Sequence, residues 1–401
     1  MSHFTLPYIH NILQNCDFNF KFEVNRENVV PIINKSLFKY LSVIKQQIDD
    51  NPDKWDIIKK YTNPYEFIHT TIPNLKFSIS KYLPISRSYF KMIEILKTFY
   101  ILEDLSDKSI QTFHLAEGPG GFIEAIVNKR GNPTDRYYGM TLQSNSDNVP
   151  GWKKTRDFLR KNKNVFLENG ADRTGNLYSS ENLKYCYKKY KNSMDIITAD
   201  GGFDFSIDFN KQEILSSRLI FAQVVFAILL QKKDGIFILK IFDIFDKFTI
   251  DILYLLNILY NKIYIVKPNT SRYANSEKYV VCKGFRLSNS ECYYKLFVKI
   301  FEKLNELDKK INNPYNISIS NILNIDIPYY FLIKLEELNA VLGQKQIEVI
   351  NNTINIIETD KNHDKIKQLQ RINIQKCINW CVKHKITHNK NVSQSNIFLQ
   401  Y

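Results

Sequence analysis

Between residues 81 and 290, short apolar runs alternate with longer segments whose apolar residues recur at helical spacing. The runs predict seven strands, at 111–116, 137–142, 164–168, 194–199, 235–241, 263–267 and 278–284. The segments between them predict helices near 121–129, 151–161, 177–191, 213–232 and 247–261. No helix separates the last two strands, so we expect them to form an antiparallel pair at one edge. The pattern therefore predicts an α/β fold with a mostly parallel, doubly wound sheet.

The two flanks of this region show a different pattern. Residues 1–80 are interrupted by five prolines and are predicted to be mostly helical. The C-terminal flank predicts amphipathic helices at 288–311, 328–358 and 366–385, with a polar connection from Asn313 to Asp326. We therefore expect an N-terminal extension (1–80), an α/β domain (81–290) and a C-terminal helical region (291–401).

The charge balance favours a polyanionic partner. The 401 residues carry a net charge of +14, with a pI near 9.2. Such an excess indicates nucleic acid before an acidic membrane. The alternative is a solvated lysine-rich surface that reflects biased composition, because isoleucine, asparagine and lysine are abundant throughout.

The cysteines and the apolar runs predict where the protein works. Six cysteines are scattered along the chain, which is typical of a reducing compartment rather than a disulfide framework. No secretory signal is visible at the N-terminus, and the longest apolar run, Leu219 to Leu230, is short for a membrane span and contains Gln223. We expect a soluble cytoplasmic protein.

A glycine-rich turn follows the first predicted strand. Glu117-Gly-Pro-Gly-Gly121 lies between the apolar run ending at Ala116 and a helical pattern that begins at Phe122. A strand, a glycine turn and a helix form the first unit of a nucleotide-binding α/β sheet, in which the turn is open to a ligand. A tight turn in any other α/β protein would fit the motif equally well.

Four polar residues are predicted to lie at the same rim of the sheet. Asp200 follows the strand 194–199, and Lys240 ends an apolar strand. Glu277 precedes the last strand, and Lys91 lies on a helix that starts near Ser86 and precedes the first strand. In an open α/β sheet, this rim is where ligands bind.

Two lysines and two acids in one site would suit methylation of a sugar hydroxyl. A ribose hydroxyl is a poor nucleophile and needs a base to take its proton. A lysine can act as that base when burial or a neighbouring cation disfavours its charged form. Lys240 has an apolar strand behind it, and Lys91 could be the neighbouring cation. The alternative is a structural cluster of ion pairs.

The same segments resemble the FtsJ-like ribose 2′-O-methyltransferases, which have a Rossmann-like fold. The resemblance rests on Glu117-Gly-Pro-Gly-Gly-Phe122, Ala199-Asp-Gly-Gly202, Leu239-Lys-Ile-Phe242 and residues 267–285. It implies a Lys-Asp-Lys-Glu tetrad with Lys240 as the base, and S-adenosylmethionine as the methyl donor. The residues that it assigns to the tetrad are Lys91, Asp200, Lys240 and Glu277. The residues that it assigns to the cofactor are Glu117, Gly118, Pro119, Gly120, Gly121, Phe122, Asp172 and Asp200.

One position departs from many methyltransferases. Where these enzymes carry an acid for the cofactor ribose, after the second strand, this chain has Gly139-Met-Thr-Leu142. Residues 267–285 and the segment 86–92 are most similar to the branch that methylates the first transcribed nucleotide of capped mRNA. In that case the partner is the capped 5′ end of an mRNA, and Ser271 and Arg272 are candidates for an RNA phosphate contact.

Other functions remain open at this point. One is 2′-O-methylation of ribosomal RNA, and another is a non-catalytic RNA-binding subunit that keeps the fold. An enzyme of mRNA caps could associate with other capping or transcription proteins. The composition and the helical extensions also resemble FtsJ-like proteins of large DNA viruses, which would place the protein in a virion or viral factory.

A second constellation, near the C-terminus, has the spacing of a zinc site. It consists of Cys377, Cys381, His384 and His388. The two cysteines are four residues apart on one apolar helix face beside Trp380. We therefore predict core cysteines and no metal site.

Overall fold

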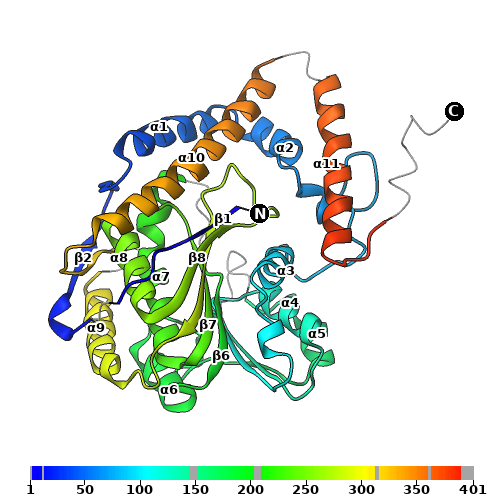
Figure 1. The fold of residues 1–401 in the computed structure, drawn as a ribbon. Coiled ribbons are helices and arrows are strands. Elements are labelled where there is room, and N and C mark those ends of the chain that lie inside the picture. The colour runs from blue at the N-terminus through cyan, green and yellow to red at the C-terminus, as the bar shows by residue number, and fades with distance from the viewer. Residues whose placement is uncertain are drawn as a thin grey trace.

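The computed structural model describes residues 2–10, 13–144, 151–202, 209–311, 316–359 and 363–389. Within this part of the chain, an eight-stranded sheet lies between helices, and a second sheet has two strands (Figure 1). The strands are β1 (Ser2–Thr5), β2 (Phe18–Val24), β3 (Gln111–Leu115), β4 (Arg136–Met140), β5 (Val165–Leu167), β6 (Met194–Ala199), β7 (Gln231–Ile241), β8 (Tyr260–Lys267), β9 (Lys278–Phe285) and β10 (Ile317–Leu323). The helices are α1 (Lys35–Gln46), α2 (Pro52–Thr62), α3 (Ser88–Thr98), α4 (Gly121–Arg130), α5 (Arg156–Lys161), α6 (Ser180–Tyr190), α7 (Gln212–Leu230), α8 (Lys247–Leu259), α9 (Glu291–Lys310), α10 (Tyr329–Glu358) and α11 (His363–Lys383).

The strand order of the large sheet is β1-β8-β9-β7-β6-β3-β4-β5. Strands β5, β4, β3, β6 and β7 pair in parallel, whereas β9 is antiparallel to both β7 and β8. The chain leaves β3 toward β4 and β5 and later returns to the other side of β3 with β6. The strand order thus reverses between β3 and β6, where doubly wound sheets bind their ligands. The Rossmann-like methyltransferase fold expected from the sequence is confirmed.

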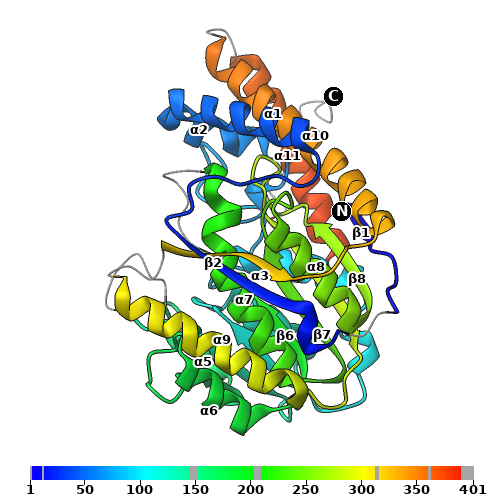
Figure 2. The same cartoon turned by 90° about the vertical axis from the view of Figure 1, so that its left-hand side faces the viewer.

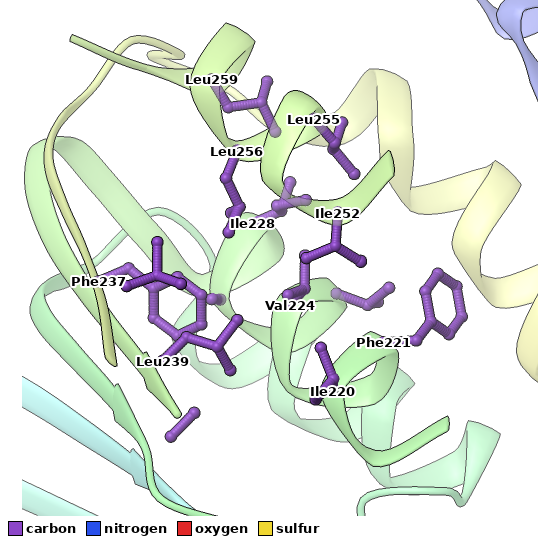
Figure 3. Close-up of a cluster of buried hydrophobic side chains, with 14 of the residues drawn as sticks. Ile220, Phe221, Val224, Ile228, Phe237, Leu239, Ile252, Leu255, Leu256 and Leu259 are labelled. Atoms are coloured by element: carbon purple, nitrogen blue, oxygen red, sulfur yellow. The ribbon is translucent and has the colours of Figure 1, made fainter. Parts of the chain in front are cut away.

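Alternating side chains of the sheet form two separate hydrophobic layers. In β7, Phe237 and Leu239 pack into the core under α6, α7 and α8, whereas Ile236 and Ile238 pack under α3 and α4. Figure 3 shows the first layer, in which α7 and α8 pack against Phe237 and Leu239 of β7. Because both faces of the strands are covered, the strands read as continuous apolar runs in the sequence.

Helix α7 is the central helix of the first layer. The helical segment Phe209–Leu230 is long and apolar enough to cross a membrane by composition, but 89% of its apolar window is buried inside the protein. The segment is longer than the apolar run counted from the sequence, because buried polar residues before that run, such as Glu213 and Ser217, belong to the same helix.

Three strands of the flanks correct the sequence-based prediction. β1 pairs antiparallel with β8 and adds an eighth strand, so the expected edge of the sheet is covered. β10 lies in the segment predicted to be a polar connection, and it pairs with β2. These pairings were missed because each partner comes from the other end of the chain, whereas sequence periodicity reports only local pattern. Ile317 and Ile319 of β10 are buried, and their alternation with serines is the signal that was available.

The flanks pack against each other and against the sheet domain. Helices α1, α2 and α10 lie together above the sheet in Figure 1, and α11 lies near α3. Figure 2 shows that β2, β10 and α9 lie across the face formed by α7 and α8. Phe331 and Leu335 of α10 belong to the same hydrophobic cluster as α7 and α8. The core therefore continues beyond residue 290, and the three domain boundaries stay predictions.

Candidate active site

The glycine turn between β3 and α4 is tightly packed. A Cβ added at Gly118 would lie 2.7 Å from the carbonyl oxygen of Gly151, and one at Gly121 would lie 2.1 Å from Ser88 Oγ. Gly120, which precedes α4, has a φ of +113°, where side chains are strained. The backbone of this turn therefore approaches its neighbours more closely than any other residue type would allow.

Glu117 lies under this turn, at the carboxyl end of β3. Its Oε1 accepts hydrogen bonds from the backbone N–H groups of Phe122 (2.7 Å) and Ile123 (3.0 Å) at the start of α4. Its Oε2 is buried and has no hydrogen-bond partner among the described residues. Burial, and then the negative charge of Asp200, raise the pKa of Glu117 to about 8. A buried carboxyl oxygen without a donor is a place where a ligand's amino group could bind.

Asp200 and Lys240 form one of two ion pairs at the rim. Lys240 Nζ donates to the backbone carbonyl of Asp200 at 2.8 Å and lies 3.3 Å from Asp200 Oδ1. The hydroxyl of Tyr279 donates to the same Oδ1 at 2.8 Å. Lys240 and Tyr279 face each other across the antiparallel pair β7–β9. The side chain of Lys240 is 12% exposed, so its ammonium group is held in place while an edge remains accessible.

Lys91 and Glu277 form the second pair. Lys91 Nζ lies 2.7 Å from Glu277 Oε1 and donates to Oε2 at 2.8 Å, with both side chains less than 10% exposed. Ser271 Oγ donates to Oε1 at 2.8 Å. Burial lowers the pKa of Lys91, although Glu277 opposes this effect, and the positive charge of Lys91 holds the pKa of Glu277 well below its usual range in spite of burial.

The structure therefore brings the four predicted rim residues into two adjacent pairs. Asp200 contributes to the electrostatics of Lys91, and Lys240 contributes to those of Glu277. Strand ends place Asp200 and Lys240, whereas α3 and the β8–β9 loop bring in the other pair. Tyr279 was missed from the sequence, because an aromatic residue in an apolar strand looks like a core residue.

The two residues proposed for a phosphate contact are engaged inside the protein. Arg272 holds Glu66 in a bidentate pair, with Nε 3.0 Å from Oε2 and Nη2 2.5 Å from Oε1. Ser271 is 1% exposed and binds Glu277. Both side chains thus shape the β8–β9 loop, a role that their polar sequence context did not indicate.

Asp172 lies in the exposed loop after β5. Its Oδ1 accepts hydrogen bonds from the backbone N–H of Thr174 (2.9 Å) and from Asn182 Nδ2 (2.8 Å), so this oxygen shapes the loop. Its proposed role near an adenine stays a prediction.

The cysteines of α11 are core residues, as predicted. Cys377 and Cys381 are fully buried, and Cys377 Sγ donates to the carbonyl of Pro64. The ring of His384 stacks on Trp380 with 4.3 Å between the ring centroids, and the backbone of His388 forms an isolated antiparallel β-bridge with that of Ser80.

Comparison with known proteins identifies similar chains. Residues 84–285 match the family model described as FtsJ-like methyltransferase. The chain is 30% identical over 258 residues to human cap-specific mRNA (nucleoside-2′-O-)-methyltransferase 1, which covers 61% of this chain and 30% of that protein. It is 37% identical over 172 residues to the Trypanosoma brucei protein of the same name, which covers 42% of this chain and 45% of that one.

Two further matches are a nematode relative and a solved structure. A Caenorhabditis briggsae relative, 30% identical over 250 residues, is named an inactive cap-specific mRNA methyltransferase 1B; the match covers 60% of this chain and 29% of that protein. A solved structure of a ribosomal RNA methyltransferase from Plasmodium falciparum has 20% identity and a TM-score of 0.35, over 50% of this chain and 97% of that chain. The chain spans less than half the length of these curated relatives. The suggested viral origin stays a prediction.

Proposed function

We propose that this chain, which belongs to the FtsJ-like methyltransferases, transfers a methyl group from S-adenosylmethionine to a ribose 2′-hydroxyl at the capped 5′ end of an mRNA. The observation that carries this proposal is the pair of lysine–carboxylate contacts at the rim, beside the glycine turn. The names of the relatives support the capped substrate.

The glycine turn fits the methionine end of the methyl donor. Glu117 Oε2 accepts no hydrogen bond from the described residues, and the α-amino group of S-adenosylmethionine could donate one to it. Gly118, Gly120 and Phe122 would then lie against the methionine end of the methyl donor; the N–H groups of Gly120 and Phe122 are already bound, to the backbone carbonyl and to Oε1 of Glu117. When bound, S-adenosylmethionine supplies an electrophilic methyl group on a sulfonium.

Lys240 is the proposed general base. The 2′-oxygen forms its new bond to the methyl carbon as the carbon–sulfur bond breaks, and the hydroxyl proton passes to Lys240 Nζ. Asp200 and Tyr279 fix the position of Nζ, which must be a neutral amine before it can accept this proton. The buried Lys91 supplies a second nitrogen close to the reacting oxygen, and Glu277 orients it.

The positive charge and one free guanidinium support an RNA substrate. Arg87, at the start of α3, is half-buried, and its side chain makes no hydrogen bond or ion pair with the described part of the chain. It lies within electrostatic reach of Glu277, so an RNA phosphate beside the target ribose could bind it. The 2′-hydroxyl, which DNA lacks, is the reacting group.

A pocket beside the β8–β9 loop offers space for a base of the substrate. Its cavity volume is about 100 Å³, and its wall contains Trp55, Asn63, Arg272 and Gln346. Asn63 is 3% exposed, and its Oδ1 has no partner among the described residues. An aromatic ring with amides and a cation is a set that binds nucleobases.

The test is methyl transfer to capped RNA that carries either an ordinary or a 2′-deoxy first nucleotide. We expect transfer only to the ordinary one, and weaker transfer to uncapped RNA and to ribosomal RNA. Lys240→Ala should lower kcat by about 10²-fold or more with S-adenosylmethionine binding retained, whereas Lys233→Ala, on the exposed start of β7, should have little effect. Methylation of the 2′-deoxy RNA would refute the first-nucleotide 2′-hydroxyl as the methyl acceptor. Undiminished turnover by Lys240→Ala would refute Lys240 as the general base.

An enzyme of mRNA caps acts where transcripts receive their caps. We therefore also propose association with other capping or transcription proteins, and a cytoplasmic location if capping occurs there. Copurification with such proteins from the source cells would test the association. A non-catalytic role is the competing function, and it predicts RNA binding without methyl transfer.

A further inference from the structure

A buried carboxylate joins three separated parts of the chain. Glu94 lies on α3, one turn after Lys91, and is 1% exposed. It accepts hydrogen bonds from the backbone N–H of Asn269 (2.8 Å), the backbone N–H of Thr270 (2.8 Å) and the indole Nε1 of Trp380 (3.0 Å). Its two oxygens therefore hold the β8–β9 loop on one side and the C-terminal helix α11 on the other.

The loop held by Glu94 leads directly to the candidate active site. Ser271 follows Thr270, and its hydroxyl donates to Glu277 Oε1 at 2.8 Å, next to the Lys91 ammonium. Helix α3 thus contacts this loop at two points. Glu94 binds Asn269 and Thr270 at the start of the loop, and Lys91 binds Glu277 at the end of the loop. These contacts close a ring, so a shift of the loop at Thr270 moves the carboxylate of Glu277.

The third donor comes from outside the region that matches the family model, which ends at residue 285. Trp380 of α11 is 4% exposed, and its ring lies edge-on to Phe90 at 5.7 Å. On its other side, His384 stacks at 4.3 Å. Two aromatic contacts therefore fix the indole, whose N–H points at Glu94.

We propose that Trp380 positions the Lys91–Glu277 pair through Glu94, so that helix α11 is a working part of the active site. This inference rests on the proposed methyl transfer and adds a positioning residue to it. Trp380 contacts neither substrate nor donor in this scheme; it acts through the loop that carries Ser271.

The physical reason is the cost of a buried charge. Burial raises the pKa of Glu94, and its hydrogen-bond donors act against that shift. Tyr65 and Tyr273 also face Glu94 within electrostatic reach. When the indole donor is removed, a proton on the carboxyl becomes more favourable, and the hold on Asn269 and Thr270 weakens because a neutral acid is a poorer acceptor.

The test is Trp380→Phe, which keeps an aromatic ring and removes the N–H. We expect kcat for capped RNA to fall about tenfold, because small displacements of catalytic groups reduce rate strongly, while KM for RNA and Kd for S-adenosylmethionine change less than twofold. Cys381→Ala, also buried on α11 but without a contact to Glu94, is the matched control for lost packing. Equal kcat in Trp380→Phe and Cys381→Ala would overturn the proposal.

A double-mutant cycle shows whether Trp380 acts through Glu94. Glu94→Gln should lower kcat, and adding Trp380→Phe to it should lower kcat no further, because both changes break the same link. If the double variant lowers kcat by the product of the two single-variant factors, the proposal is overturned.

A second readout does not depend on activity. Hydrogen exchange in a peptide that spans residues 268–277 should be faster in Trp380→Phe than in Cys381→Ala. If the wild type transfers no methyl group, the proposed function fails, and hydrogen exchange alone then decides the positioning role: unchanged exchange overturns it, and faster exchange supports it.

Discussion

The Lys91–Glu277 pair offers a quantitative test of the site's electrostatics. Glu277→Gln keeps the shape of the side chain but leaves the Lys91 ammonium buried without its counter-charge, at a contact of 2.7 Å and with both side chains under 10% exposed. Breaking one partner of such a buried pair costs about 3 to 5 kcal/mol of unfolding free energy. The backbone carbonyl of Glu277, which Lys267 Nζ contacts at 2.6 Å, is unchanged by the substitution.

Proton loss sets an upper limit on this cost. Lys91 can become neutral in the folded variant, and from its ordinary pKa of 10.5 this requires about 5 kcal/mol at pH 7, at about 1.4 kcal/mol per pH unit. A lysine whose folded pKa lies below its unfolded pKa destabilises the fold at low pH, and the penalty disappears as pH approaches 10.5. The difference in unfolding free energy between the Glu277→Gln variant and the wild type should therefore shrink to about 2 kcal/mol at pH 9.

The assay is denaturant unfolding followed by tryptophan fluorescence, from pH 7 to pH 9.5. The double variant Lys91→Met with Glu277→Gln should recover most of the lost stability, because no unpaired charge remains. Glu348→Gln, on an exposed ion pair of α10, should leave the midpoint unchanged. A loss below about 1 kcal/mol in Glu277→Gln, or a gap that does not narrow as pH rises, would refute the reasoning.

Three further substitutions test the turn and the rim. Tyr279→Phe removes the hydroxyl that binds Asp200 at 2.8 Å, so kcat should fall about tenfold and the unfolding free energy by about 1 to 3 kcal/mol. Glu117→Gln should remove the gain in S-adenosylmethionine affinity that calorimetry shows as pH rises toward about 8, because the wild-type carboxyl becomes charged in this range and binds the amino group of the ligand better. Gly121→Ala should destabilise the fold by about 1 to 3 kcal/mol, because its Cβ would meet Ser88 Oγ.

Each of these substitutions has a control or an opposing outcome. Gly131→Ala adds a Cβ with no atom within 4 Å, so it reports backbone strain without the clash of Gly121→Ala. A loss below about 1 kcal/mol in Gly121→Ala would contradict the close packing of the turn. Unchanged turnover in Tyr279→Phe would show that Asp200 needs no second partner, and a pH-independent wild-type affinity would contradict the role of Glu117.

Much of the sheet domain could be predicted because its information is local. The strand–turn–helix pattern around Glu117 placed β3 and α4 within one residue of their observed bounds. Asp200 and Lys240 could be found because a polar residue at the end of an apolar strand stands out. Their position at one rim follows from parallel strands, whose carboxyl ends meet at the same edge.

The pairing inside the site depended on the tertiary structure. Lys91 binds Glu277, which is 186 residues away, and the sequence shows two lysines and two acids without saying which lysine meets which acid. The sequence also made Arg272 a candidate for an RNA phosphate contact, and it gave no sign that Glu66 of the N-terminal flank binds this side chain. Such contacts are set by packing between distant elements.

By itself, the sequence determined the class of fold, the glycine turn and the identity of the four rim residues, since hydrophobic periodicity and strand ends are properties of short segments. Only the tertiary structure decided that β1 covers the β8 edge of the sheet, that Tyr279 supports Asp200 and that Trp380 of α11 binds Glu94 beside the β8–β9 loop. These features join segments far apart in the chain, and their hydrogen bonds form only where burial brings a donor and an acceptor together.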